Sequence, residues 1–395
     1  MKKIIFLTIL LACNFGVFAN SKDKHFELSK NLDIFNSLYK SLNLHYVDTI
    51  PLNKMVKAGI DGMLRNIDPY TVYIPAENDE DFTLMTTGEY AGVGAIITQR
   101  DSAIYINEVY VDMPAYNVGL RPADKIVSVD KTKIKNHTVS QVSEMLRGIP
   151  GTEVKVGILH PNETKVKYYN ITRKQIYINP ILYYNVVSDS IGYINLSSFT
   201  DNCSSELKKA YLELKEKGIK GLIIDLRSNP GGLLREAINI SNFFLPKGET
   251  IVSTKGKDED NNVTYKAHST PIDLNIPLVI MVDSNSASAS EILAGAIKES
   301  YGGFVVGTKT FGKGTVQQTK KLSDGSMIKY TIENWLTPNG NWINEKGIEP
   351  TDEVELDEKY YTNYYYGYNK MKRPIIKTII NITLTFPLLT IIPPN

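Results

Sequence analysis

Residues 277–298 read PLVIMVDSNSASASEILAGAIK, and their pattern indicates the class of fold. The apolar run 278–282 predicts a buried strand. The small residues after it allow the backbone to turn tightly. From Glu291 onward, apolar side chains recur at the spacing of an amphipathic helix. The stretch is therefore one strand–turn–helix unit.

The same alternation extends on both sides of this unit. We expect strands at 191–196, 221–226, 278–282 and 304–307, and helices at 201–217, 233–244 and 288–299. Strands and helices that alternate along a chain favour an α/β layer structure. The third region of the chain, from about residue 173, is thus predicted to be an α/β domain.

The first half of the chain has a different pattern. Apolar residues at helical spacing predict a helix within 27–46, and Pro51 can begin a second one that runs to Leu64, before the break at Asp68-Pro69. These helices could pair two subunits, and packing within a monomer is equally consistent. Further on we expect strands at 93–98, 103–111, 126–129 and 154–159, and a helix at 138–147.

The composition limits the kinds of protein and of catalytic group that the chain can provide. The chain has 395 residues, which favours two or three domains. Its 44 basic and 43 acidic residues give a net charge of +1, which argues against a protein built mainly to hold nucleic acid. Two cysteines exclude a disulfide scaffold and a Cys₄ or Cys₂His₂ zinc site. Catalysis would therefore use Ser, Lys, Asp, Glu or His.

The first 19 residues read as a secretory signal. Lys2 and Lys3 precede an apolar run, and small residues Val17 and Ala19 fit cleavage after Ala19. Leu10–Cys13 also resembles a lipoprotein site, so lipidation at Cys13 is a second reading and an uncleaved apolar N-terminus a third. We expect an exported protein of the bacterial cell envelope or periplasm.

The end of the chain, 358–395, stays unassigned. Six tyrosines fall within 360–368, and an apolar stretch follows from Ile375 to Ile392. That stretch is about long enough to span a bilayer, but Lys377 and Pro387 interrupt it. It could be a disordered or packed tail, or a segment that lies on a membrane surface.

Two segments could expose backbone N–H groups to an anion. Gly92-Val93-Gly94-Ala95 enters the strand at Ile96 and could hold a carboxylate, or be a turn without a ligand. Residues 225–233, DLRSNPGGL, end a strand and open a helix, and Gly231 and Gly232 there suit an oxyanion hole. The alternative for this second segment is a plain strand-to-helix turn.

Candidate nucleophiles and bases are few. There is no Gly-x-Ser-x-Gly or His-Glu-x-x-His motif, and we expect the five histidines to be surface or turn residues. Ser288 begins a helix, where developing negative charge is favoured, but Ser288-x-x-Glu291 also fits a capping box. Lys313 lies between two glycines, where burial would disfavour its charged form, although a surface loop lysine is the alternative. A phosphate loop does not fit, because Gly314 follows the lysine.

Met113–Ile126 and Ser140–Gly148, taken with the Gly92–Gly94 turn, resemble a PDZ domain over 88–160. The resemblance implies a groove beside Ile96 that binds a peptide as an added strand and holds its C-terminal carboxylate. Ala123 stands where such domains usually have glycine, so we expect slight strain in that turn.

The three candidate segments, in their order, resemble the C-terminal processing (tail-specific) peptidases, which are Ser-Lys dyad proteases. The likeness covers about 27–357 and includes DGMLRNIDPYT at 61–71, IGYINLSSF at 191–199, LTPNG at 336–340 and KGIEP at 346–350. It implies a signal at 1–19, a helical region at 20–86, a PDZ domain at 87–172 and an α/β peptidase core of the crotonase-like type at 173–357.

The resemblance also assigns roles to residues. Ser288 would be the nucleophile, Lys313 the base, and Gln317 the residue that orients the lysine. Such a dyad implies no metal and no cofactor. The oxyanion donors would be the backbone N–H groups of Ala289, Gly231 and Gly232. Glu299 stands where an acidic residue often follows in the family, with no defined role.

The implied function is cleavage of exported proteins near their exposed C-termini, with the PDZ domain capturing the tail and gating activity. Partners would be protein or peptide substrates, without nucleic acid. Membrane association through lipidated Cys13 or the apolar tail, and a homo-oligomer, remain open. Two alternatives are a non-catalytic PDZ peptide receptor and a carrier of an apolar ligand.

Overall fold

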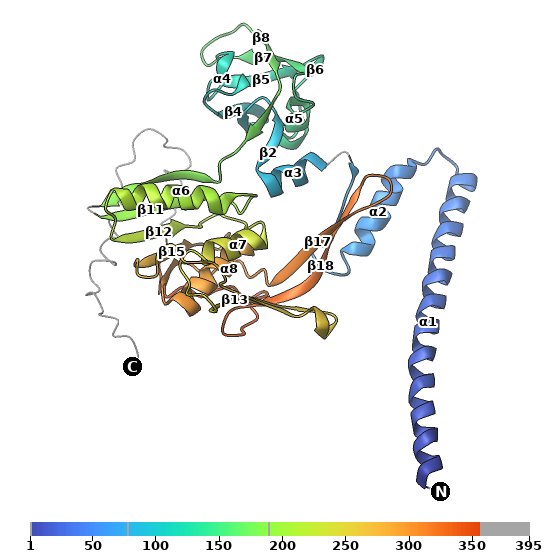
Figure 1. Cartoon of the computed structure of the whole chain (residues 1–395). Helices are drawn as coiled ribbons and strands as arrows, with labels where there is room; N and C mark the ends of the chain where they lie inside the picture. Colours follow the sequence, from blue (N-terminus) through green and yellow to red (C-terminus); the bar gives the residue numbers. More distant parts are fainter. Residues whose placement is uncertain (1, 77–78, 189, 356–395) are drawn as a thin grey trace. The chain divides into compact units, whose positions relative to one another are not determined.

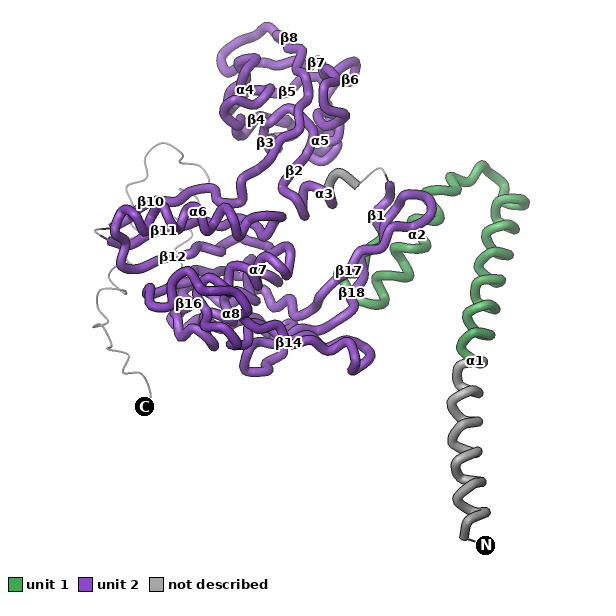
Figure 2. Tube along the Cα trace, in the orientation of Figure 1, with its two compact units in different colours: residues 1–73 green, residues 74–395 purple. Residues whose placement is uncertain are grey.

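The computed structural model describes residues 2–76, 79–188 and 190–355, without the side chains of 2–23 and 79–81 (Figure 1). The chain divides into two compact units, residues 1–73 and 74–395 (Figure 2). The predicted tail at 358–395 lies outside the described residues, as does the side chain of Cys13.

The first unit is helical, as predicted. Helix α1 (Lys2–His45) and helix α2 (Leu52–Leu64) are joined by a short turn, where the Tyr39 hydroxyl donates to the Leu52 carbonyl at 3.2 Å. Strand β1 (Val72–Ile74) follows at the boundary of the units. Among the described helices, none is both long and apolar enough to cross a bilayer.

The second unit begins with helix α3 (Asp79–Thr87) and strand β2 (Glu89–Gly92), which pairs with β9 (Lys174–Tyr177). Between them lies a small β domain with strand order β3-β4-β5-β7-β8. Its elements are β3 (Ala95–Arg100), β4 (Ala103–Val109), α4 (Pro114–Asn117), β5 (Lys125–Val129), β6 (Thr132–Lys133), α5 (Val139–Leu146), β7 (Glu153–Leu159) and β8 (Lys167–Thr172). Strand β3 is an edge strand, and this leaves one side of it open for pairing.

The α/β region contains a six-stranded sheet in the order β10-β11-β12-β15-β16-β19. Its strands are β10 (Ile181–Ser188), β11 (Ile191–Leu196), β12 (Gly221–Asp225), β15 (Leu278–Val282), β16 (Phe304–Gly307) and β19 (Asp352–Glu353). All pairs are parallel except β10 with β11. The four strands predicted here are confirmed.

Helices cover one face of this sheet (Figure 1). They are α6 (Cys203–Glu216), α7 (Leu234–Ser241), α8 (Ala289–Ala296) and the π-helical turn η3 (Ile297–Tyr301). Ile224 and Ile280 pack among these helices, whereas their neighbours Ile223 and Val279 belong to a smaller cluster on the other face. Successive side chains of a strand point to opposite faces of the sheet, and this explains the division.

A second antiparallel sheet flanks the α/β layer. It contains β13 (Thr250–Gly256), β14 (Val263–Lys266), β17 (Thr315–Lys321) and β18 (Met327–Leu336), and the turn η2 (Glu259–Asn261) joins β13 to β14. The sequence did not predict these strands, because most of their side chains are polar or only partly buried. Trp335 of β18 is fully buried and anchors this sheet to the core.

Parallel strands place their carboxyl ends at one edge of the sheet. The segments after β12, β15 and β16 therefore leave the sheet at the same edge. These are the segments that carry the Gly231-Gly232 turn, Ser288 and Lys313.

The strain expected in the turn at Ala123 is confirmed: this alanine has a φ of 72°. A left-handed conformation costs a non-glycine residue about 1–2 kcal/mol, and glycine would recover part of this. We expect Ala123→Gly to raise the free energy of unfolding by about 0.5–1 kcal/mol. Urea unfolding of the intact chain, with hydrogen exchange of β5 and β7 amides, measures this.

Ala115 provides the control, because it is buried in the right-handed helix α4. There the same substitution should destabilise the domain by about 1 kcal/mol. Equal destabilisation by both substitutions would contradict the assignment of strain to Ala123.

Candidate active site

Ser288 occupies a strained turn between β15 and α8. Its φ is 57° and its ψ is −112°, so this serine has a backbone conformation that L-residues rarely adopt. Such a residue costs roughly 1–3 kcal/mol and persists only where its surroundings fix it. The sequence predicted the tight turn, and the structure adds the strain.

The neighbouring serines have structural roles that Ser288 does not share. Ser286 donates its hydroxyl to the Leu226 carbonyl at 2.8 Å, and Ser290 donates to the Asn229 carbonyl at 2.9 Å. Both are fully buried, while Ser288 is partly exposed. Of the three serines in Ser-Ala-Ser-Ala-Ser, the middle one is thus the one accessible to a substrate.

Glu291 joins the Ser288 turn to the Lys313 loop. Its carboxylate is fully buried and accepts hydrogen bonds from the backbone N–H groups of Ser288 at 2.7 Å and Lys313 at 2.9 Å. It also accepts from the Gly312 N–H at 2.7 Å and the Thr310 hydroxyl at 2.6 Å. The capping box expected from Ser288-x-x-Glu291 is present, so Ser288 also begins helix α8 as its N-cap. The Glu291 carboxylate organises the second segment as well.

Lys313 lies in a tightly packed loop between β16 and β17. A Cβ atom on Gly314 would lie 2.6 Å from the Asn344 nitrogen, so only glycine fits there. The indole N–H of Trp335 donates to the Lys313 carbonyl at 2.9 Å. The predicted close approach of backbone at these glycines is confirmed, and the lysine is partly buried rather than a surface residue.

Gln317 and Glu299 lie in β17 and η3. The Gln317 amide donates to the Thr315 hydroxyl at 2.9 Å and to the Thr331 hydroxyl at 3.3 Å. The Glu299 carboxylate accepts from the Asn339 N–H at 2.8 Å. That Gln317 orients Lys313 stays a prediction.

The Gly231-Gly232 turn lies directly against Ser288. A Cβ atom on Gly231 would be 3.0 Å from the Ser288 Cβ and 2.9 Å from the Ala289 nitrogen. The Gly231 N–H donates to Asn229 Oδ1 at 2.9 Å. The N–H groups of Gly232 and Ala289 make no hydrogen bond within the part of the chain that the structure describes. Two of the three predicted oxyanion donors are therefore available.

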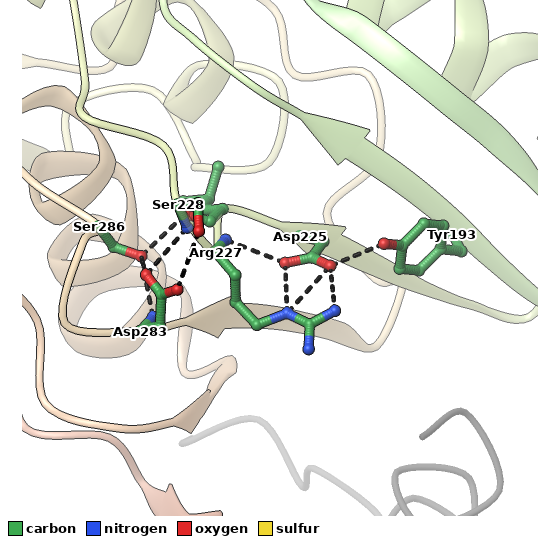
Figure 3. A network of polar contacts seen from close by, with 7 residues as sticks. Tyr193, Asp225, Arg227, Ser228, Asp283 and Ser286 are labelled. Atoms are coloured by element: carbon green, nitrogen blue, oxygen red, sulfur yellow. Dashed lines mark hydrogen bonds and ion pairs between the residues drawn. The ribbon is translucent and has the colours of Figure 1, made fainter. Parts of the chain in front are cut away.

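A polar network supports these turns (Figure 3). Asp225 accepts from the Tyr193 hydroxyl at 2.7 Å and forms a two-pronged ion pair with Arg227, with a shortest distance of 2.6 Å. Asp283 accepts from the Ser228 N–H at 2.9 Å, and this links the end of β12 to the end of β15. No role was predicted for these carboxylates, because Tyr193 and Ser228 lie 32 and 55 positions away from them in the chain.

Histidine and cysteine side chains outside this edge have structural roles. The Nδ1 of His160 lies 2.6 Å from Asp124 Oδ1, and its Nε2 lies 2.7 Å from the Tyr169 hydroxyl. His160 is therefore hydrogen-bonded on both sides and partly buried, rather than a free surface residue. Burial, and then the charge of Glu236, raises the pKa of the Cys203 thiol well above its ordinary value. This thiol is not a nucleophile at neutral pH.

The segment predicted to bind a peptide leads into the edge strand β3. Gly94 has a φ of 77°, and a Cβ atom there would lie 2.4 Å from the Met113 Cβ. Val93 is buried, while Ile96 on the open edge strand is 39% exposed. Residues Gly92 to Ala95 thus form a tight turn that ends at an accessible strand edge.

Glu291→Gln tests the role of the buried carboxylate. An amide NH₂ cannot accept the N–H groups that Glu291 binds, so at least one buried donor loses its partner. We expect a loss of about 1–3 kcal/mol in the free energy of unfolding, measured by urea denaturation. Glu299→Gln is the control, because that carboxylate accepts one exposed backbone N–H, and it should change stability little. Equal effects would contradict the assignment.

Comparison with known proteins agrees with this architecture. Residues 190–354 match the model of peptidase family S41, and residues 82–159 match the PDZ domain. A probable CtpA-like serine protease of Staphylococcus aureus strain COL is 36% identical over 90% of this chain and 71% of its own length. One from strain MW2 is 38% identical over 84% of this chain and 66% of its own length.

A solved putative S41 protease from Bacteroides fragilis is 16% identical. It covers 81% of this chain and 87% of its own, with a TM-score of 0.55, and so supports the fold alone. The family match, the PDZ match and the serine protease relatives agree with one another. The chain therefore belongs to peptidase family S41, the CtpA-like serine proteases that carry a PDZ domain.

Proposed function

We propose that the protein is an exported serine endopeptidase that cleaves protein substrates near their C-termini through a Ser288/Lys313 dyad. One observation carries this proposal: a single buried carboxylate, Glu291, binds the backbone of both residues. Nucleophile and base therefore belong to one rigid arrangement, next to a glycine turn with a free N–H group.

The reaction follows from this arrangement. Neutral Lys313 takes the proton of the Ser288 hydroxyl, whose oxygen attacks the substrate carbonyl. The N–H groups of Gly232 and Ala289 stabilise the oxyanion of the tetrahedral intermediate. The intermediate collapses to an acyl-enzyme as the amine leaves with the lysine's proton. A water molecule then gives a proton to Lys313 and attacks the acyl carbonyl. The bond from this carbon to the Ser288 oxygen breaks, Lys313 returns the proton to Ser288, and the shortened protein leaves with a new C-terminal carboxyl group.

The PDZ domain would deliver the substrate. An extended peptide can pair with the open edge of β3, and the turn at Gly92–Ala95 can hold its terminal carboxylate. Capture of the tail would raise the local concentration of the scissile bond and gate activity. Substrates would be proteins with accessible C-termini.

Export rests on the first 19 residues. We propose cleavage after Ala19, with lipidation at Cys13 as the competing route to the cell envelope. Mass analysis of the mature protein distinguishes them, because a diacylglyceryl-modified Cys13 would begin the chain in one case and Asn20 in the other. The same spectrum reports whether 358–395 is retained.

Ser288→Ala and Lys313→Ala test the dyad. Each removes a group that acts in the transition state, and each should lower kcat for an unfolded protein substrate by at least about 10³-fold. Release of C-terminal fragments measures the rate. Ser284→Ala, on an exposed serine of the same turn, and Lys309→Ala, on a lysine of a surface ion pair, should stay near the wild-type rate.

Undiminished cleavage by Ser288→Ala would overturn the nucleophile. If the wild-type protein bound C-terminal peptides without cleaving any, the protein would be a peptide receptor instead.

The second test concerns the carboxylate of the substrate. A peptide with a free C-terminus should bind the protein at least about tenfold more tightly than the same peptide with a C-terminal amide, because the amide loses a charged acceptor for the loop N–H groups. Fluorescence anisotropy with Ser288→Ala avoids turnover. Equal affinities would show that the PDZ domain does not read the terminus.

A further inference from the structure

Asn229 is fully buried and connects three segments around the Ser288 turn. Its Nδ2 donates to the Leu196 carbonyl at 2.8 Å, and its Oδ1 accepts from the Gly231 N–H at 2.9 Å. Its backbone carbonyl accepts from the Ala287 N–H at 3.1 Å and from the Ser290 hydroxyl at 2.9 Å. One residue thus ties the end of β11, the glycine turn and both sides of Ser288.

Two hydrogen bonds restrict the two peptide groups on either side of the Gly231 Cα atom. Asn229 holds the N–H of Gly231, and the Gly231 carbonyl accepts from the Phe199 N–H at 2.9 Å. In a trans peptide, C=O and N–H point in opposite directions, so the N–H of Gly232 points away from Phe199. Glycine would otherwise rotate easily between several conformations. The two bonds therefore restrict Gly231 from both ends.

We propose that Asn229 is the positioning residue of the oxyanion hole. Because the Gly231 N–H is bonded to Asn229, it does not donate to the oxyanion. The Gly232 N–H is oriented instead to donate to the oxyanion together with the N–H of Ala289. Through Ala287 and Ser290 it also sets the distance between the glycine turn and the nucleophile. This inference rests on the proposed peptidase function. It reduces the three predicted oxyanion donors to two, the N–H groups of Gly232 and Ala289.

The chemistry of the side chain explains why an asparagine stands here. Its amide donates and accepts at the same time, as the Leu196 carbonyl and the Gly231 N–H require. An ionised aspartate accepts only, and it would face the Leu196 carbonyl with a second acceptor. An alanine would leave two buried polar groups without partners.

The test uses Asn229→Asp and Asn229→Ala, with the same two changes at Asn242 as matched controls. Asn242 is also a buried asparagine that bonds backbone on both sides: it donates to the Ile238 carbonyl at 2.9 Å and accepts from the His268 N–H at 2.8 Å. Two inhibitors of one peptide sequence are compared. A peptide aldehyde forms a tetrahedral adduct with an oxyanion, and the peptide alcohol forms none.

We expect the Asn229 variants to lose at least about tenfold in kcat and in aldehyde affinity, because the oxyanion is held in the transition state and in the adduct. Alcohol affinity and KM should change less than about threefold. The Asn242 variants should lower the melting temperature while keeping the wild-type ratio of aldehyde to alcohol affinity. Asn229 variants that kept this ratio would overturn the proposal and leave Asn229 a purely structural residue.

A measurement on the wild-type protein covers the case in which Asn229 variants do not fold. With ¹⁵N-glycine labelling, the aldehyde should shift the Gly232 amide, while the Gly231 amide stays protected from exchange with and without inhibitor. A shift at Gly231 with loss of its protection would overturn the inference. Failure of the wild-type protein to bind the aldehyde at all would instead contradict the peptidase function.

Discussion

The Glu291 carboxylate is the interaction on which the candidate site depends. It is fully buried, and its hydrogen-bond donors come from the Ser288 turn and from a loop 22 residues further along the chain. A buried carboxylate without such donors would be strongly unfavourable. The helix that Ser288 begins and the loop that carries Lys313 are therefore stable only together, because one carboxylate binds the backbone of both residues.

The parallel sheet makes this coupling possible, and glycines at its edge allow the segments to approach. A Cβ atom on Gly307 would lie 1.9 Å from the Val282 carbonyl, and one on Gly231 would lie 2.5 Å from the Ala287 carbonyl. Each glycine stands where one segment crosses the backbone of another. The geometry of the site is thus determined by contacts between main chains. Side chains such as those of Glu291 and Asn229 accept hydrogen bonds from backbone N–H groups near these crossings.

The sequence predicted the strands of the α/β core and the β domain, because apolar runs, tight turns and family motifs are local signals. It did not predict the β17–β18 hairpin, whose mostly polar and partly buried strands lack the regular apolar alternation of a half-buried sheet. Nor did it predict the links made by Asn229 and His160, whose partners lie 61 and 36 positions away in the chain. Such contacts depend on how strands are ordered in a sheet, which no local pattern shows.

The alternation Ser-Ala-Ser-Ala-Ser shows how the turn exposes one hydroxyl. Ser286 and Ser290 donate their hydroxyls to carbonyls of the 225–232 segment and fix the turn from both sides. Ser288, between them, is left with a positive φ and with Glu291 on its backbone N–H. The strain at Ser288 is tolerated because hydrogen bonds hold the residues on both sides of it in place. A serine at either outer position could not attack a substrate without breaking the turn that positions it.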